Sequence, residues 1–169
     1  AKKELLDSLC PGDIAVLNRD DGFLNRFRKR RLKIYYFSIK RDSDFKAYNI
    51  RKERPGWSFE VNNRPYMLKS DAYHDIYNAI GAIAIGSLFN MPPSRIRQAL
   101  GNYAGLDKRM KTCVINEIRF IDDTYNSSPD AVIAAINVFK GLQCVGSKIA
   151  VLGDMMELGK FSALEHRKI

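Results

Sequence analysis

Two short segments combine polar and charged residues at spacings that could bind a nucleotide. Residues 74–78 (HDIYN) open an expected helix, where His74 and Asn78 lie four residues apart and therefore share a face. A helix N-terminus also favours anions. Residues 108–110 (KRM) follow a presumed domain boundary, where Arg109 can bind a phosphate through two parallel hydrogen bonds. Taken singly, either segment is better explained by helix capping or by ordinary surface residues.

Two further segments carry carboxylates and glycines. In residues 121–129 (IDDTYNSSP), Asp122 and Asp123 leave an expected strand, and a polar loop then leads into a helix. Ligands bind at the carboxyl ends of strands in open α/β sheets, and a carboxylate there can hold ribose hydroxyls or a metal. A capping loop without a ligand is the competing interpretation. Residues 151–159 (VLGDMMELG) lack the G-x-G-x-x-G spacing, so a dinucleotide-binding turn is rejected.

The elements expected to position these residues follow from hydrophobic periodicity and turn-forming residues. The pattern from residue 112 onward, a strand pair followed by a helix and a strand, indicates a parallel α/β unit cut short by the end of the chain. The boundary between the two parts is expected near Leu106-Asp107. Helices are predicted over residues 2–9, 23–31, 73–89, 94–100 and 129–140, and strands over 14–17, 33–39, three segments within 45–68, a hairpin over 112–122, and 148–152.

Bulk composition narrows the class of protein. The chain has 169 residues, of which 46% are hydrophobic and 28% charged, as in ordinary soluble globular proteins. The longest apolar stretch, residues 79–89, is too short to cross a bilayer. Three scattered cysteines share no metal-ligand spacing, which favours reduced thiols in a cytosolic protein. No signal peptide is visible.

The net charge of +9 raises the question of nucleic-acid binding, because six basic residues cluster between positions 26 and 33. A solvated helix face explains such a run more simply, and no RNA-binding signature or finger spacing accompanies it. The charge could also suit anionic nucleotide substrates. The basic residues of the run are Arg26, Arg28, Lys29, Arg30, Arg31 and Lys33.

Considered together, the order and spacing of these segments resemble the Mur ligase family. Residues 122–129 (DDTYNSSP) are similar to its D-D-S-Y-N-A-N-P motif, and residues 153–159 followed by His166 are similar to its G-D-M-x-E-L-G…H motif. The helix start at His74 is similar to its H-N-x-x-N-A motif. The opening AKKELL and the strand IAVLN also match, so the resemblance covers almost the whole chain. It points to the branch that joins D-alanyl-D-alanine to a UDP-linked muramoyl tripeptide.

The resemblance implies an α/β fold in two pieces. Residues 1–107 would be the C-terminal part of a central ATP-binding domain, and residues 108–169 the N-terminal part of a Rossmann-like C-terminal ligase domain. The implied activity is ATP- and Mg²⁺-dependent amide-bond formation through an acyl phosphate, in peptidoglycan precursor synthesis. The implied substrates are UDP-N-acetylmuramoyl-tripeptide and D-alanyl-D-alanine. The parent enzyme would be a cytoplasmic monomer, without nucleic-acid partners or membrane insertion.

The same resemblance assigns roles to five residues. Asn78 would lie against the adenine, with Asp75 at the position of a family asparagine. Arg109 would reach the ATP phosphates as a catalytic residue, and Asp123 would hold the ribose. Lys2 falls where the family has a lysine carbamylated by carbon dioxide, and it could bind metal only in that form. The adenosine residues of the two parts are expected to line one cleft.

Departures from the family pattern limit what this chain can do alone. Asp75 replaces an asparagine, Ala72 a glycine and Ser128 an asparagine. No G-x-x-x-x-G-K-[ST] phosphate loop is present in these residues, so the chain by itself is expected to be inactive. Two alternatives stay open: a sister Mur-type or polyglutamate-adding ligase, and a basic nucleic-acid-binding module.

Overall fold

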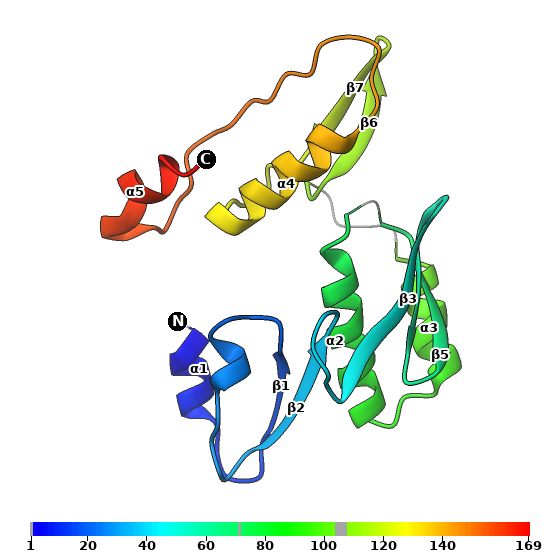
Figure 1. The fold of residues 1–169 in the computed structure, drawn as a ribbon, viewed down its shortest axis with the longest axis vertical. Coiled ribbons are helices and arrows are strands. Elements are labelled where there is room, and N and C mark those ends of the chain that lie inside the picture. The colour runs from blue at the N-terminus through cyan, green and yellow to red at the C-terminus, as the bar shows by residue number, and fades with distance from the viewer. Residues whose placement is uncertain (1, 71, 104–107) are drawn as a thin grey trace. The chain divides into compact units, whose positions relative to one another are not determined.

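The computed structural model describes residues 2–70, 72–103 and 108–169, with the side chains of residues 2 and 3 excepted. The chain divides into two compact units, residues 1–104 and 105–169, each described here by itself (Figure 1). The boundary expected near Leu106-Asp107 lies outside the described residues.

The first unit is built on a mixed five-stranded sheet with strands in sequence order. β1 pairs with β2 and β2 with β3 in parallel, whereas β3, β4 and β5 form an antiparallel meander. The carboxyl ends of β1 and β2 therefore meet at one edge, where polar loops can be brought together. The strands are β1 (Ile14–Asn18), β2 (Lys33–Ser38), β3 (Phe45–Glu53), β4 (Gly56–Val61) and β5 (Arg64–Leu68).

Helix α2 (Asp75–Leu88) packs against β1, β2 and β3, and α3 (Pro93–Gly101) packs against β5 and α2 (Figure 1). The face of α2 that meets the sheet carries Ile76, Ile80 and Ile83, which are fully or almost fully buried together with Phe59 of β4. Burying each of these side chains contributes about 2 kcal/mol to folding. This packing sets the depth of α2, and hence the place of the polar residues at its start.

Helix α1 (Lys2–Ser8) is anchored by a smaller cluster in which Leu6 is buried against Ala15, Leu17 and Tyr36. No helix in the described ranges is both long and apolar enough to pass through a bilayer.

The second unit contains the hairpin β6 (Lys111–Ile115) and β7 (Ile118–Asp122), then α4 (Pro129–Gly141), the 3-10 turn η2 (Gly159–Phe161) and α5 (Ser162–His166). The hairpin turns at Asn116 and Glu117, whose φ angles of 48° and 65° are those of a primed two-residue turn. Ser128 caps α4, because its Oγ accepts a hydrogen bond from the Ala131 N–H at 3.4 Å. Hairpin, cap and helix were all predicted from the sequence.

Two predicted elements are absent. Residues 23–31 form only the 3-10 turn η1 (Leu24–Arg26), because a longer helix would stack like charges such as Arg26 and Arg30 at four-residue spacing. Residues 148–152 form no strand, and Ile149 and Val151 are 78% and 91% exposed. A strand needs a neighbour to satisfy its backbone, and no described residue pairs with this segment. The predicted parallel unit is therefore incomplete.

Candidate functional site

The start of α2 brings together the residues of the first candidate segment. Asn78 donates a hydrogen bond from Nδ2 to Oδ1 of Asp75 at 3.2 Å, and the hydroxyl of Ser70 donates to Asp75 Oδ2. His74 Nε2 lies 3.6 Å from Asp75 Oδ1, with the His74 side chain 52% exposed. Asp75 is thus the centre of a small polar cluster at the helix N-terminus, and this central position was not foreseen from the sequence.

Asn78 is exposed and keeps part of its hydrogen-bonding capacity for a ligand. A primary amide has two N–H donors and a carbonyl acceptor. The contact with Asp75 uses one N–H, so the carbonyl and the second N–H are without partners among the described residues. This pair of groups matches the amino donor and ring-nitrogen acceptor on the edge of an adenine.

Lys2 lies at the first position of α1, and its side chain is outside the described set. The helix itself is held at its C-terminal end by Lys29, whose Nζ donates to the carbonyls of Leu6, Asp7 and Leu9 at 3.2, 2.9 and 2.9 Å. A cation at this end also complements the helix dipole. The sequence placed Lys29 in a solvated basic face, which is wrong for this residue.

Arg28 of the same basic run is also used within the fold. Its Nη1 donates to the hydroxyl of Tyr36 at 2.7 Å and to the carbonyl of Phe27 at 2.8 Å, and its guanidinium lies over the Tyr36 ring. Arg28 and Lys29 therefore contribute contacts that stabilise the first unit, although Arg28 stays exposed. No local sequence pattern indicated this, because the partners lie up to 23 residues away.

In the second unit, residues 108–110 run beside residues 123–125. Asp123 Oδ1 accepts from the Met110 N–H at 3.0 Å, and the Tyr125 N–H donates to the Lys108 carbonyl at 3.0 Å. Asp123 Oδ2 has no partner among residues 108–169 and can accept from a sugar hydroxyl. The structure thus places Arg109 and Asp123, which are 14 positions apart in the chain, in neighbouring segments.

Arg109 is exposed, and its guanidinium lies 4.6 Å from the centroid of the Tyr125 ring. Its neighbours Lys108 and Met110 both have positive φ, at 59° and 49°, which is uncommon for residues with large side chains. The guanidinium makes no ion pair with any described residue. Stacked on the Tyr125 ring, it can bind an anion through its two-pronged donor edge.

Asp122 has a structural role in the loop that follows β7. The hydroxyl of Thr124 donates to Asp122 Oδ1 at 2.7 Å and the Thr124 N–H donates at 3.0 Å. These hydrogen bonds, the hydroxyl first, hold the pKa of Asp122 below its ordinary value. Asp122 is therefore charged at neutral pH and shapes the loop that leads to Ser128 and α4.

The loop of residues 153–159 is tied to His166 of α5. The Met155 N–H donates to His166 Nε2 at 2.9 Å, and His166 Nδ1 lies 2.8 Å from the Ser162 carbonyl. Because Nε2 accepts, Nδ1 carries the proton and donates to that carbonyl. Met155 is buried, at 5% exposure. The G-D-M-x-E-L-G segment and the later histidine thus form one structural motif.

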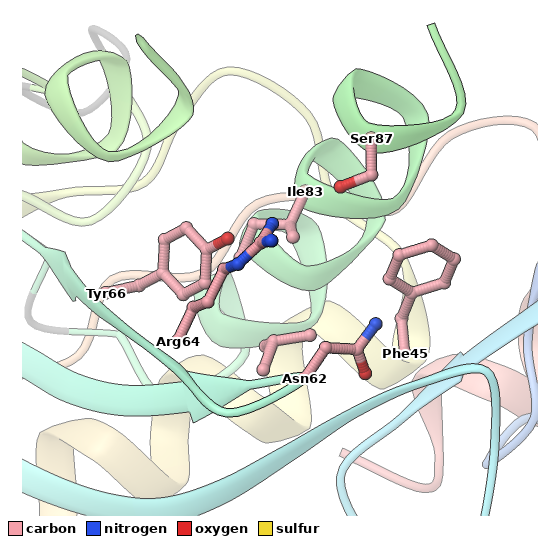
Figure 2. A pocket seen from close by; sticks show the side chains of 7 residues that line it. Phe45, Asn62, Arg64, Tyr66, Ile83 and Ser87 are labelled. Atoms are coloured by element: carbon pink, nitrogen blue, oxygen red, sulfur yellow. The ribbon is translucent and has the colours of Figure 1, made fainter. Parts of the chain in front are cut away.

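One pocket in the first unit, of about 270 Å³, lies away from these residues (Figure 2). Ile83 and Ser87 of α2 face it from the helix, and Arg64 and Tyr66 of β5 face it from the sheet. Phe45, Val61 and Asn62 complete the lining. None of the residues singled out in the sequence lines it.

Within each unit the structure brings candidate residues together: Asp75 with Asn78, and the segment of Arg109 with that of Asp123. The expected meeting of Asn78 with the other two spans both units and stays a prediction. Among the described residues, no three His, Cys, Asp or Glu side chains could jointly hold a metal ion.

Comparison with known families and structures gives consistent matches along the chain. Residues 1–86 match the Mur ligase middle domain, and residues 108–169 match the family described as Mur ligase, glutamate ligase domain. A UDP-N-acetylmuramoyl-tripeptide–D-alanyl-D-alanine ligase from Buchnera aphidicola subsp. Baizongia pistaciae is 34% identical over 176 aligned positions, which cover 100% of this chain and 38% of that protein.

Two solved structures extend the comparison. MurF from Acinetobacter baumannii aligns with a TM-score of 0.85 at 26% identity, covering 99% of this chain and 38% of that one. MurF from Thermotoga maritima in complex with ADP aligns with a TM-score of 0.76 at 22% identity, covering 94% of this chain and 37% of that one, which supports the fold. This chain thus spans less than two fifths of the length of these relatives.

Proposed function

Because the chain belongs to the Mur ligase family, we propose that it is an internal part of an ATP-dependent ligase that joins D-alanyl-D-alanine to UDP-N-acetylmuramoyl-tripeptide. The observation that carries this proposal is the 34% identity along the whole chain to a ligase of that name. Residues 1–107 would belong to the ATP-binding domain and residues 108–169 to the following ligase domain.

The geometry supports an adenosine-binding role for the start of α2. The carbonyl and one N–H of Asn78 have no partner among the described residues, and these are the two groups needed for an adenine edge. Asp75 is 20% exposed at its side chain and can accept from the adenine amino group, but it cannot donate to a ring nitrogen. Asn78 is therefore the principal adenine-binding residue in this proposal, and Asp75 positions it.

The second unit supplies the groups for ribose and phosphate. Asp123 uses one carboxylate oxygen on the Met110 N–H and can accept from ribose hydroxyls through the other. Arg109 presents a guanidinium that pairs with no carboxylate of the described residues and suits a phosphate. In the proposed reaction ATP phosphorylates a substrate carboxylate and leaves as ADP. The amine of D-alanyl-D-alanine then attacks the acyl carbon, which forms the amide bond and releases phosphate. Arg109 would stabilise the charge that develops on the transferred phosphoryl group.

Lys2 is the one residue proposed to bind Mg²⁺, and only in its carbamylated form. A carbamylated lysine is an anion with two oxygen donors, a ligand type that Mg²⁺ accepts. The bound ion would neutralise phosphate charge during the transfer. The three cysteines, all free and exposed, support a reducing, cytoplasmic location.

The direct test is an activity assay of the full-length protein that contains this chain. With ATP, Mg²⁺ and UDP-N-acetylmuramoyl-tripeptide, phosphate release should depend on added D-alanyl-D-alanine, and mass spectrometry should detect the pentapeptide product. Matched reactions replace the dipeptide with L-alanine or L-glutamate. A further reaction supplies UDP-N-acetylmuramate and L-alanine. Turnover in that reaction, with none on the tripeptide, would transfer the assignment to a sister ligase.

The carboxylate at position 75 provides a milder prediction. In the full-length enzyme Asp75→Asn should leave the affinity for ATP equal or improved, because an amide can both accept from and donate to adenine. The contact with Ser70 can persist, since the serine hydroxyl can accept from the new amide N–H. Titration with ADP by calorimetry measures the effect. A loss beyond about tenfold, near 1.4 kcal/mol, would show that the charge itself is required.

A further inference from the structure

The carboxylate of Asp20 joins loops at the carboxyl edge of the parallel strands. Asp20 lies in the turn that follows β1, and the chain after β2 returns to it. Its Oδ2 accepts from the N–H groups of Ile39 and Lys40 at 2.8 and 2.9 Å, and its Oδ1 accepts from the Arg41 N–H at 3.1 Å. A single side chain therefore fixes the ends of β1 and β2 relative to each other.

The same carboxylate also reaches helix α2. The hydroxyl of Tyr77 donates to Asp20 Oδ2 at 3.0 Å, across 57 positions of sequence. Tyr77 lies between Asp75 and Asn78, which are hydrogen-bonded to each other. The loops at the sheet edge are thus tied to the helical turn that carries the candidate adenine-binding residues.

The contact adds a directional restraint that apolar packing does not supply. Ile76 and Ile80, on either side of Tyr77 in the sequence, are fully buried and set how deeply α2 lies on the sheet. Such contacts are non-directional and tolerate small rotations of a helix about its axis. A hydrogen bond to a carboxylate weakens steeply when its angle is distorted, so it holds the rotation.

The ionisation of the Asp20 carboxyl group suits this role. Burial raises the pKa of Asp20, but the N–H groups of Lys40 and Ile39, the hydroxyl of Tyr77 and the N–H of Arg41 together lower it by more. The carboxylate is therefore charged at neutral pH and accepts from all four donors. Burial and the adjacent Asp20 charge raise the pKa of Tyr77, so its hydroxyl keeps the proton that it donates.

We propose that Asp20 and Tyr77 are positioning residues for nucleotide binding, which orient the first turns of α2 so that Asn78 meets the adenine. This inference rests on the proposed function, because it assumes that Asn78 binds adenine. Neither residue touches the nucleotide in this scheme. Their effect is exerted on the orientation of the helix, and it should therefore appear in nucleotide affinity before it appears in the rate of the chemical step.

The test is Tyr77→Phe in the full-length protein. This substitution removes only the hydroxyl, so the ring stays and Asp20 keeps its three backbone donors. The dissociation constant for ADP, measured by calorimetry, and the KM for ATP are expected to rise about three- to tenfold. The KM for the UDP-linked substrate and kcat should stay within about twofold, because α2 orients only the adenosine in this scheme.

Tyr73→Phe is the matched control. It also removes a tyrosine hydroxyl at the start of α2, but the Tyr73 ring contacts Trp57 and its hydroxyl has no hydrogen-bond partner within the described part of the chain. ADP affinity unchanged in Tyr77→Phe, or lowered equally in both variants, would overturn the inference. The inference would also be overturned if both KM values rose and kcat fell together with a lowered melting temperature.

Asn78→Ala separates this inference from the proposed function. If Asn78→Ala leaves ADP affinity unchanged, the adenine assignment fails, and the positioning role fails with it. If Asn78→Ala weakens ADP binding and Tyr77→Phe does not, the positioning role fails alone.

Discussion

Replacing Lys2 with alanine in the full-length ligase is expected to lower kcat by about 100-fold or more, with partial recovery when a short-chain carboxylate such as acetate is added. A carbamate at this position would be an anion able to hold Mg²⁺, which would supply charge neutralisation worth several kcal/mol in phosphoryl transfer. A free carboxylate can enter the space left by the deleted side chain. Initial rates at saturating ATP, with and without acetate, measure both effects.

Lys3→Ala is the control for this experiment, because Lys3 is the next residue of the same short helix and is the same residue type without the proposed carbamate. It should retain activity within about twofold, because no catalytic role is proposed for Lys3. Wild-type turnover in Lys2→Ala would make Lys2 an ordinary surface lysine. Equal losses in the two variants would indicate a general requirement for positive charge on α1.

The position of Lys2 depends on contacts far along the chain. Helix α1 is held by the burial of Leu6 and by Lys29, which donates to three carbonyls at its C-terminal end. Seven residues are too few to form a stable helix alone, so these tertiary contacts are what keep α1 folded.

Elements with local causes could be predicted from the sequence. The turn at Asn116 and Glu117, the Ser128 cap before Pro129, and the apolar face of α2 each follow from residues within a few positions of one another. The adenosine-binding roles of Asn78, Arg109 and Asp123 stay predictions.

Elements that depend on distant partners could not be predicted. Residues 148–152 have a strand-like sequence but lack a neighbouring strand among the described residues, and they stay exposed. Lys29 looked like a solvated cation, although its partners lie 20 to 23 residues earlier. The hydrogen bond between Asp20 and Tyr77 spans 57 positions, and no periodicity connects two such residues.

Arg109 is expected to contribute a large effect, because its guanidinium has no counter-ion among the described residues. The guanidinium stacks on Tyr125 and pairs with no described carboxylate, so its charge is available to a ligand phosphate. Arg109→Ala in the full-length enzyme should lower kcat/KM for ATP by about 100-fold or more, as expected for loss of a group that stabilises transition-state charge. Arg109→Lys should recover only part of this loss, because lysine keeps the charge but not the two-pronged geometry.

Arg119→Ala and Tyr125→Phe distinguish a specific role from a general effect of charge or packing. Arg119 is an exposed arginine of β7, and its removal should leave kcat/KM for ATP within about twofold. Tyr125→Phe keeps the aromatic ring beneath the guanidinium, so it should also be close to the wild type. If Arg109→Lys is as active as the wild type, bidentate phosphate binding is wrong and a simple cation suffices. If Arg119→Ala loses as much activity as Arg109→Ala, the effect is one of overall charge, and Arg109 has no special place in the site.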